Sequence, residues 1–278
     1  AVEGCGAMKL QFIKTNPTEN MTLLIETPMP REQQLAIAQR LIAYDSVYAE
    51  QAGYIEEATQ PLAEKRLQMM AGEFCGNASL SLAAVLAEEK GLQIGEECEI
   101  LLEVSGADEL VQCRMKREEN GFSGRVAMPL PKAVELRVFS LRGARYELAV
   151  VVFEGISHVI VPISLWGEDA AAMTEEAARA WAEDMPPAFG ILLYNEENSS
   201  LRPLVCIRDV SLIWERGCGS GTSAIGAYLA IRDGQSVSVR LRQPGGVMGA
   251  EVAFAEGELA SIHISGNVRI AARGVAYL

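Results

Sequence analysis

Apolar and polar residues alternate along the first half of the chain with two different periods. Residues 9–26, KLQFIKTNPTENMTLLIE, hold two apolar runs on either side of a Pro, Asn and Thr turn, which predicts a β-hairpin. In residues 31–43 the apolar side chains recur at helical spacing on one face, which predicts an amphipathic helix. The later elements expected in this half are strands over 52–58, 66–72 and 98–106, and a helix from Cys75 to about Glu89 that stops at Gly91.

The second half repeats this order with different residues. Residues 146–164 again predict strand, turn and strand, and residues 170–184 predict a helix. Order and spacing therefore favour two homologous α+β halves that arose by duplication. The remaining elements expected here are strands over 189–195, 204–214 and 236–246, and a helix from Cys218 to about Asp233.

The domain boundary is expected in the proline-containing stretch MPLPKAVE, residues 128–135. We therefore predict an N-terminal domain over 8–131 and a C-terminal domain over 132–265. Residues 266–278 contain a further strand-like run, NVRIAARGVAYL, which is expected to cross back to the first domain.

One short motif occurs in both halves. GEFCGNASLSLAAVLA, residues 72–87, and RGCGSGTSAIGAYLA, residues 216–230, each place a Cys-Gly pair directly before a helix that begins with small residues. The start of a helix offers free N–H groups and a partial positive charge, which favour carboxylate binding and lower the pKa of a nearby thiol. Gly76, Gly219 and Gly221 allow the main chain to approach a ligand closely. Anion binding and thiol activation are therefore predicted at the same place, once in each half.

Two such turns that face each other across a cleft between the domains would place sulfur atoms on opposite sides of one small carboxylate-bearing molecule. One thiolate would remove an α-proton while the other thiol returns a proton to the opposite face. This chemistry inverts a stereocentre and makes Cys75 and Cys218 the predicted catalytic residues. A single cysteine before a helix is usually an inert small side chain, but its repetition in matching positions favours a functional pair.

The other cysteines and the histidines are expected to be structural. Cys98, Cys113 and Cys206 lie in apolar strand-like stretches and are predicted to be buried. His158, in EGISHVIVP, is predicted to be a hydrogen-bonded histidine of a turn, although its place opposite the first hairpin turn leaves a catalytic role open. His263, in ASIHISG, is predicted to be structural.

A loose dinucleotide-binding fingerprint, Gly219-x-Gly221-x-x-Ala224, overlaps the second motif. The strand after it ends in VRLRQPGG and has no acidic residue where a ribose-binding Asp or Glu belongs. The sequence also has no Gly-x-Ser-x-Gly elbow. Dinucleotide binding and serine hydrolase chemistry are therefore disfavoured.

The amino-acid composition limits the kinds of molecule that the protein is expected to bind. The formal charge of −13 and the pI near 4.8 disfavour nucleic acid and anionic membranes, and no apolar run approaches the roughly 20 residues of a membrane span. Six cysteines without a Cys-x-x-Cys pair, together with only two histidines, predict no metal site. The beginning of the sequence does not resemble a secretory signal, so reduced thiols and a cytoplasmic location are expected. The stretch AVEGCGA before Met8 is typical of a non-native remnant, so it is left out of the predictions together with Cys5.

FCGNAS and ERGCGSGTSA resemble the two active-site signatures of the diaminopimelate epimerase family of cofactor-independent amino-acid racemases. KTNPTENMTLL, YAEQAGYIE, SGADELVQC, SLIWERGCGSGT and RQPGG are more similar to the branch that makes D-histidine for staphylopine-type metallophores. The resemblance covers most of the chain. It implies two pseudo-symmetric domains, each a curved and mostly antiparallel sheet around a central helix, with the active site in the cleft between the domains. It also implies catalysis without pyridoxal phosphate or another cofactor.

The resemblance further implies roles for individual residues. Cys75 and Cys218 match the two catalytic cysteines of the family, and the residues after each cysteine match those that bind the substrate carboxylate. Glu50 matches a glutamate of the histidine-racemising branch that could hold an imidazole N–H, with a solvated surface acid as the alternative. The substrate-binding positions that the resemblance implies are Asn20, Glu50, Gln51, Gly76, Asn77, Glu215, Arg216, Gly219 and Ser220.

Departures from the family pattern bear on the substrate. Lysine-pathway members present asparagines to the distal end of diaminopimelate, whereas this chain has GISH, LQMMAG and FGILLYN in the corresponding segments. A distal carboxylate would lose its partners there, which favours histidine. Arg216 argues the other way, because its guanidinium could meet that carboxylate. The alternatives are therefore epimerisation of diaminopimelate from the LL to the meso form, and a non-catalytic amino-acid-binding protein; whether the protein is a homodimer is left open.

Overall fold

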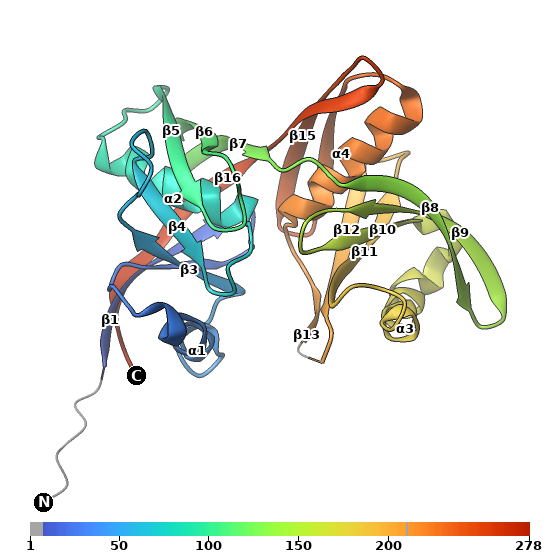
Figure 1. Cartoon of the computed structure of the whole chain (residues 1–278), viewed down its shortest axis with the longest axis horizontal. Helices are drawn as coiled ribbons and strands as arrows, with labels where there is room; N and C mark the ends of the chain where they lie inside the picture. The colour runs from blue at the N-terminus through green and yellow to red at the C-terminus, as the bar shows by residue number, and fades with distance from the viewer. Residues whose placement is uncertain (1–7, 210) are drawn as a thin grey trace, which may run out of the picture. The chain divides into compact units, whose positions relative to one another are not determined.

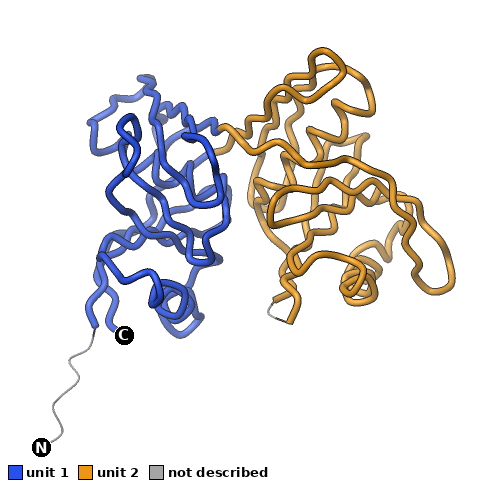
Figure 2. Tube along the Cα trace, viewed as in Figure 1, with its two compact units in different colours: residues 1–126, 267–278 blue, residues 127–266 orange. Residues whose placement is uncertain are grey.

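The computed structural model describes residues 8–209 and 211–278, so the predicted N-terminal remnant with Cys5 lies outside the described residues. The chain forms two compact units (Figure 2). One unit extends to Val126 and includes Asn267–Leu278, and the other comprises Ala127–Gly266. The division falls before the boundary at 131/132 expected from the sequence, so the proline-containing stretch lies wholly within the second unit.

The first unit is built on a sheet that closes on itself. Each strand of this sheet lies beside the next one in the chain. The last strand of the unit pairs with the strand before it and also, antiparallel, with the first strand, which closes the sheet. The closing segment is NVRIAARGVAYL, the run expected to cross back. The strands are β1 (Lys9–Pro17), β2 (Thr22–Ile25), β3 (Gln51–Glu56), β4 (Lys65–Met69), β5 (Glu97–Val104), β6 (Val111–Glu118), β7 (Gly121–Met128) and the C-terminal part of β16 (Glu258–Tyr277).

Helix α2 (Gly76–Glu89) runs through the interior of this sheet, while α1 (Arg31–Ile42) packs on its outside (Figure 1). Every residue of α2 from Gly76 to Ala87 is buried, and the helix contacts strands β1 to β6. Its sequence is apolar or small on every side, which suits a helix surrounded by strands. The hydroxyl of Thr15 on β1 donates to Ser81 on α2 over 2.8 Å, so these buried polar groups satisfy each other.

The second unit has the same kinds of element. Two short 3-10 turns, η1 (Ile163–Leu165) and η2 (Gly167–Asp169), precede α3 (Ala170–Trp181), and α4 (Gly219–Asp233) packs on the sheet face opposite α3. No helix among the described residues has the length and apolar character needed to cross a membrane. The strands are β8 (Ala133–Leu141), β9 (Ala144–Val152), β10 (Ser157–Pro162), β11 (Ala188–Asn195), β12 (Ser200–Ile207), β13 (Ser211–Trp214), β14 (Val237–Gln243), β15 (Gly246–Ala255) and the N-terminal part of β16.

Strand pairing repeats between the units in the order expected from the sequence. In the first unit β1–β2 is antiparallel, β2–β3 parallel, β3–β4 antiparallel and β4–β5 parallel. In the second unit β9–β10, β10–β11, β11–β12 and β12–β14 follow the same alternation. Each unit is thus a sheet-dominated α+β assembly in which the cysteine-preceded helix follows the fourth strand of this series, apart from the added strand β13.

The central strands of the second unit are buried on both faces. Val159 and Ile191 belong to the core on the side of α3, whereas the next residues, Ile160 and Leu192, belong to the core on the side of α4. Strands covered on both sides are expected to read as continuous apolar runs. This burial accounts for the apolar character of FGILLYN.

One predicted strand was wrong. Residues 204–214 form two antiparallel strands, β12 and β13, in which Leu204 pairs with Trp214 and Ile207 with Ser211. Asp209, between the two, has a positive φ of 59°, which a continuous strand does not accommodate. This hairpin leads the chain back toward Cys218.

Candidate active site

Cys75 and Cys218 begin the two central helices with the same local geometry. Each is the extended N-cap residue, with φ −138° and ψ 112° at Cys75 and φ −106° and ψ 110° at Cys218. The sulfur of Cys75 accepts a hydrogen bond from the N–H of Ala78 at 3.4 Å, and that of Cys218 accepts one from Gly221 at 3.3 Å. In each case the thiol takes the capping role that Ser, Thr, Asp or Asn usually has. The repeated motif is therefore one structure built twice, once in each unit.

Both helix starts present main-chain donors. No described residue accepts a hydrogen bond from the N–H groups of Gly76, Gly219 and Ser220, which lie in the first turns of α2 and α4. Such groups carry the positive end of the helix dipole and are able to bind a carboxylate. Asn77 lies in the same turn as Gly76, as the sequence predicted.

In the first unit the structure brings four of the predicted residues into one chain of hydrogen bonds. The Cys75 thiol donates to Oε1 of Gln51 at 3.1 Å, and Nε2 of Gln51 donates to Oδ1 of Asn20 at 2.6 Å. Nδ2 of Asn20 then donates to the Glu50 carboxylate at 2.8 Å. The buried hydroxyl of Thr22, which sequence reasoning missed, accepts a second bond from Gln51 at 2.9 Å. Thr22 and Gln51 are register partners on parallel strands, a long-range relationship without a local signal.

The end of β5 holds the loop that carries Cys75. Ser105 donates its hydroxyl to the carbonyl of Glu73 at 2.9 Å and accepts the N–H of Met69 at the same distance. A Cβ on the next residue, Gly106, would lie 2.4 Å from the nitrogen of Phe74, and Gly106 has a φ of +73°. Only glycine fits this position, so the main chain just before Cys75 is clamped against β5.

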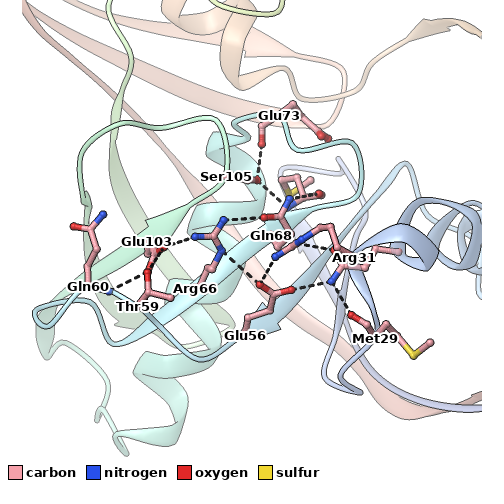
Figure 3. A network of polar contacts seen from close by, with 12 residues as sticks. Met29, Arg31, Glu56, Thr59, Gln60, Arg66, Gln68, Glu73, Glu103 and Ser105 are labelled. Carbon is pink, nitrogen blue, oxygen red and sulfur yellow. Dashed lines mark hydrogen bonds and ion pairs between the residues drawn. The ribbon is translucent and has the colours of Figure 1, made fainter.

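A partly buried ion pair lies beside this clamp (Figure 3). Arg66 on β4 and Glu103 on β5 are register partners, and the Arg66 guanidinium donates to the Glu103 carboxylate. Burial favours the neutral form of Glu103, but hydrogen bonds from Thr59, Gln60 and Arg66 together hold its pKa below the ordinary value. Arg66 also donates to Gln68 at 3.0 Å, which links the ion pair to the strand that leads into the Cys75 loop.

In the second unit Gln243 holds the Cys218 turn. Its Oε1 accepts the N–H of Cys218 at 2.8 Å, and its Nε2 donates to the hydroxyl of Thr222 at 2.7 Å. Thr222 in turn donates to the Cys218 carbonyl at 2.6 Å, which closes a ring of hydrogen bonds around the first helical turn. Gln243 and Thr222 were not predicted as site residues. The sequence signal that could have identified Gln243 is the RQPGG stretch, which contains this residue.

His158 lies on strand β10 and not in a turn, which corrects the prediction. Its side chain is fully buried, and Nε2 lies 2.9 Å from the Ser220 hydroxyl, which in turn lies 3.5 Å from the sulfur of Cys218. A Cβ on Gly190 would lie 2.3 Å from Nδ1, so the glycine makes room for the ring. Burial lowers the pKa of His158 to about 3, so the imidazole is neutral at physiological pH. His158 is thus linked to Cys218 through the predicted residue Ser220.

Glu215 and Arg216 precede Cys218 but have different surroundings. Burial and the neighbouring Glu215 carboxylate raise the pKa of Cys218, and burial also raises the pKa of Glu215. The helix start was expected to lower the pKa of the thiol, but at Cys218 desolvation outweighs the bonds from Gly221 and Ser220. The side chain of Arg216 is exposed and donates to the carbonyl of Pro244 at 3.3 Å.

The remaining described cysteines are less uniform than expected. Cys113 is fully buried, and burial raises its pKa. Cys98 and Cys206 are only partly buried, because they occupy the second residue of β5 and the last residue but one of β12, near strand ends. Within the described part of the chain, no three His, Cys, Asp or Glu side chains are grouped so as to hold a metal ion.

Comparison with known proteins places the chain in a family. A family model described as histidine racemase CntK N-terminal domain matches residues 9–277. Two histidine racemases from strains of Fusobacterium nucleatum are 32% and 29% identical to the chain, each over 97% of this chain and 97% of the relative. Among solved structures, a hydroxyproline epimerase from Agrobacterium vitis with bound trans-4-hydroxy-L-proline has a TM-score of 0.71 at 13% identity, covering 97% of this chain and 93% of that chain, a likeness of fold alone. The resemblance found in the sequence is thereby confirmed: the chain belongs to the histidine racemase family, a family of amino-acid isomerases.

Proposed function

We propose that this protein interconverts L- and D-histidine by a two-base mechanism in which Cys75 and Cys218 exchange protons with the α-carbon. The observation that carries the proposal is the shared N-cap role of the two cysteines, each of which accepts an N–H from the third residue of its helix. A structural cysteine has no need of this duplication. The relatives from Fusobacterium nucleatum are histidine racemases, which supports histidine as the substrate.

The proton transfers balance as follows. A thiolate on one side accepts the α-proton of histidine and becomes a thiol, while the thiol on the other side donates its proton to the opposite face and becomes a thiolate. The reverse reaction uses the same groups with their roles exchanged. The raised pKa of Cys218 supports its starting as the thiol, which makes Cys75 the first base.

Negative charge develops on the substrate carboxylate as the α-proton is removed. Preorganised hydrogen-bond donors are needed to stabilise this charge. The first-turn N–H groups of Gly76, Asn77, Gly219 and Ser220 are suited to this role, because they point from helix starts and need no reorganisation. No cofactor is required in this scheme. The two-domain assignment, 8–131 with 266–278 and 132–265, and a diaminopimelate-epimerase-like cleft between pseudo-symmetric domains are part of the same proposal.

Side-chain recognition is proposed for the cluster around Asn20 and Gln51. The exposed Glu50 carboxylate at the end of this cluster has the chemistry to accept an imidazole N–H. Diaminopimelate is the competing substrate, for which the exposed guanidinium of Arg216 is the relevant partner. A cytoplasmic location and a role in metallophore synthesis accompany the histidine proposal.

The test is racemisation and α-hydrogen exchange in deuterium oxide. Purified protein incubated with L-histidine should produce D-histidine, seen by chiral chromatography, and the product should carry deuterium at the α-carbon. Cys75→Ser and Cys218→Ser should each lower the rate by at least about 100-fold, the range of a lost acid or base. Cys98→Ser, a partly exposed strand cysteine, is the matched control and should retain activity.

Three outcomes would decide against the proposal. Full activity in either active-site variant would exclude the two-thiol mechanism. Turnover of LL-diaminopimelate in preference to histidine would replace the substrate. Saturable histidine binding without α-hydrogen exchange would indicate a binding protein.

A further inference from the structure

Strand β8 forms an open edge of the sheet in the second unit. Among the described strands it pairs with β9 alone, and it stands at the end of the strand order. It is nine residues long, and its register with β9 is continuous from Ala133 to Leu141. An edge strand leaves the N–H and C=O groups of every second residue without a partner strand. A long and regular edge of this kind is suited to pairing with another strand.

One face of β8 is apolar although it is exposed. Leu136 is 65% exposed and Val138 is 52% exposed. Both lie on the same face of the strand as Val134, because alternate residues of a strand share a face. Val134 packs against the core on the side of α4, so the exposed residues extend that apolar surface outward. Covering them with a further strand would bury apolar area that is now open to solvent.

The other face of β8 carries two charges of opposite sign. Glu135 and Arg137 lie on either side of Leu136 in the sequence, and their partly exposed side chains form an ion pair with each other. Two charges of the same sign would repel a second copy of this strand in any register. One acid and one base instead allow a register in which the two copies attract each other.

The sequence of β8 is complementary to itself about Leu136. When two copies pair antiparallel with Leu136 opposite Leu136, Glu135 of each copy lies opposite Arg137 of the other. The same register places Val134 opposite Val138 on the apolar face. Opposite charges and β-branched side chains directly across two strands stabilise the pairing. A register centred on Glu135 or on Arg137 would set like charges opposite each other, so the charges select the register centred on Leu136.

We propose that β8 pairs antiparallel with β8 of a second copy of this chain, which gives a two-fold symmetric homodimer with Leu136 at the axis. The sheet of one copy's second unit continues into that of the other. Such an interface is closed, because both copies use the same edge and neither presents it to a third copy. The dimer does not depend on the proposed racemisation.

Sedimentation equilibrium of the full chain tests the proposal. At micromolar concentration the wild type should have twice the 30.0 kDa mass of one chain, and this mass should not rise further with concentration. Glu135→Arg and Arg137→Glu each set like charges opposite each other twice, so each should weaken dimerisation by about tenfold or more. The double variant that combines both changes restores opposite charges and should dimerise as the wild type does.

Two further samples make the test specific to this edge. An equimolar mixture of the Glu135→Arg chain and the Arg137→Glu chain should form a heterodimer, because the acids of one chain then lie opposite the bases of the other. Arg114→Glu is the matched control, since it breaks an exposed ion pair with Glu97 on β6, a strand that has neighbours on both sides. It should dimerise as the wild type does. Circular dichroism shows whether each variant is folded.

A wild type that remains monomeric at high micromolar concentration would overturn the proposal. Unchanged dimerisation in both single variants would do the same, since it would place the contact on another surface. A folded double variant that stays monomeric would exclude the register centred on Leu136. Because sedimentation does not depend on catalysis, failure here leaves the racemase proposal untouched.

Discussion

The thiol of Cys75 donates a hydrogen bond to the side-chain oxygen of Gln51 over 3.1 Å. The amide of Gln51 is itself anchored, because it donates to Asn20 and to Thr22. The oxygen that faces the sulfur therefore has a fixed direction. A base that must take a proton from one side of a carbon depends on such orientation, which makes Gln51 a positioning residue for Cys75.

Gln51→Glu is expected to raise the pKa of Cys75. The new carboxylate preserves the size of the side chain but adds a negative charge next to the sulfur, which disfavours the thiolate. The rising limb of the pH profile of kcat/KM should move upward by about one pH unit. Gln93→Glu, which adds the same charge on an exposed loop, should leave the limb in place. An unshifted profile in Gln51→Glu would show that Cys75 is not the base that limits the reaction.

Glu215→Gln is expected to lower the pKa of Cys218. Burial remains in the variant, but the adjacent negative charge that opposes thiolate formation is removed. The rate of iodoacetamide alkylation at Cys218, followed by mass spectrometry as a function of pH, should reach its midpoint at lower pH than in the wild type. Glu168→Gln is the control. A midpoint that stays or rises would mean that Glu215 does not act on this sulfur.

The buried His158 should make the protein less stable in acid. Its folded-state pKa is about 3 because of burial, whereas an unfolded histidine titrates near 6.5. As the pH falls from 6.5 towards 3, the unfolded state binds a proton that the folded state does not, so stability decreases by up to about 1.4 kcal/mol per pH unit. Urea unfolding at pH 6 and pH 4 should show a larger loss for the wild type than for His158→Gln. Parallel losses would mean that His158 titrates alike in both states.

Gly106 and Gly91 form a matched pair for testing the clamp before Cys75. Their φ values are +73° and +74°, but a Cβ on Gly106 would lie 2.4 Å from the nitrogen of Phe74, whereas one on Gly91 would meet nothing within 4 Å. Gly91→Ala should cost roughly 1 kcal/mol of unfolding free energy, from backbone strain alone. Gly106→Ala should cost about 3 kcal/mol or more and lower kcat at least about tenfold, because the Cys75 loop must move.

Urea unfolding and histidine racemisation measure the two effects together. Equal stability and equal activity of the two alanine variants would show that β5 does not hold the Cys75 loop.

The cysteine caps were predictable from the sequence because a capped helix start is a local structure. Cys75 and the small residues after it lie next to one another in the chain, and the same pattern recurs at Cys218. Helix and strand order was predictable for the same reason, since hydrophobic periodicity extends over neighbouring residues. The continuous strand expected over 204–214 was wrong because the chain reverses between Ile207 and Ser211, where Asp209 has a positive φ.

The supporting contacts were not predictable in this way. His158 lies 62 positions from Ser220, and Gln243 lies 25 positions from the N–H of Cys218 that it accepts. Such pairs depend on strand register, which no local pattern specifies. Burial raises the pKa of Cys218 and outweighs the lowering effect of the helix start. The extent of that burial depends on how the whole unit packs, which the local sequence does not specify.

The pairing of strand β16 with β1 affects the order in which the two units complete their sheets during synthesis. The residues of β16 from Val268 to Tyr277 pair with β1, although more than 240 residues separate Val268 from the end of that strand. The sheet around α2 therefore stays open, with an unpaired edge on β1, until residues 268–277 have been synthesised. The first unit, although its strands leave the ribosome first, thus closes its sheet only after the second unit has been made.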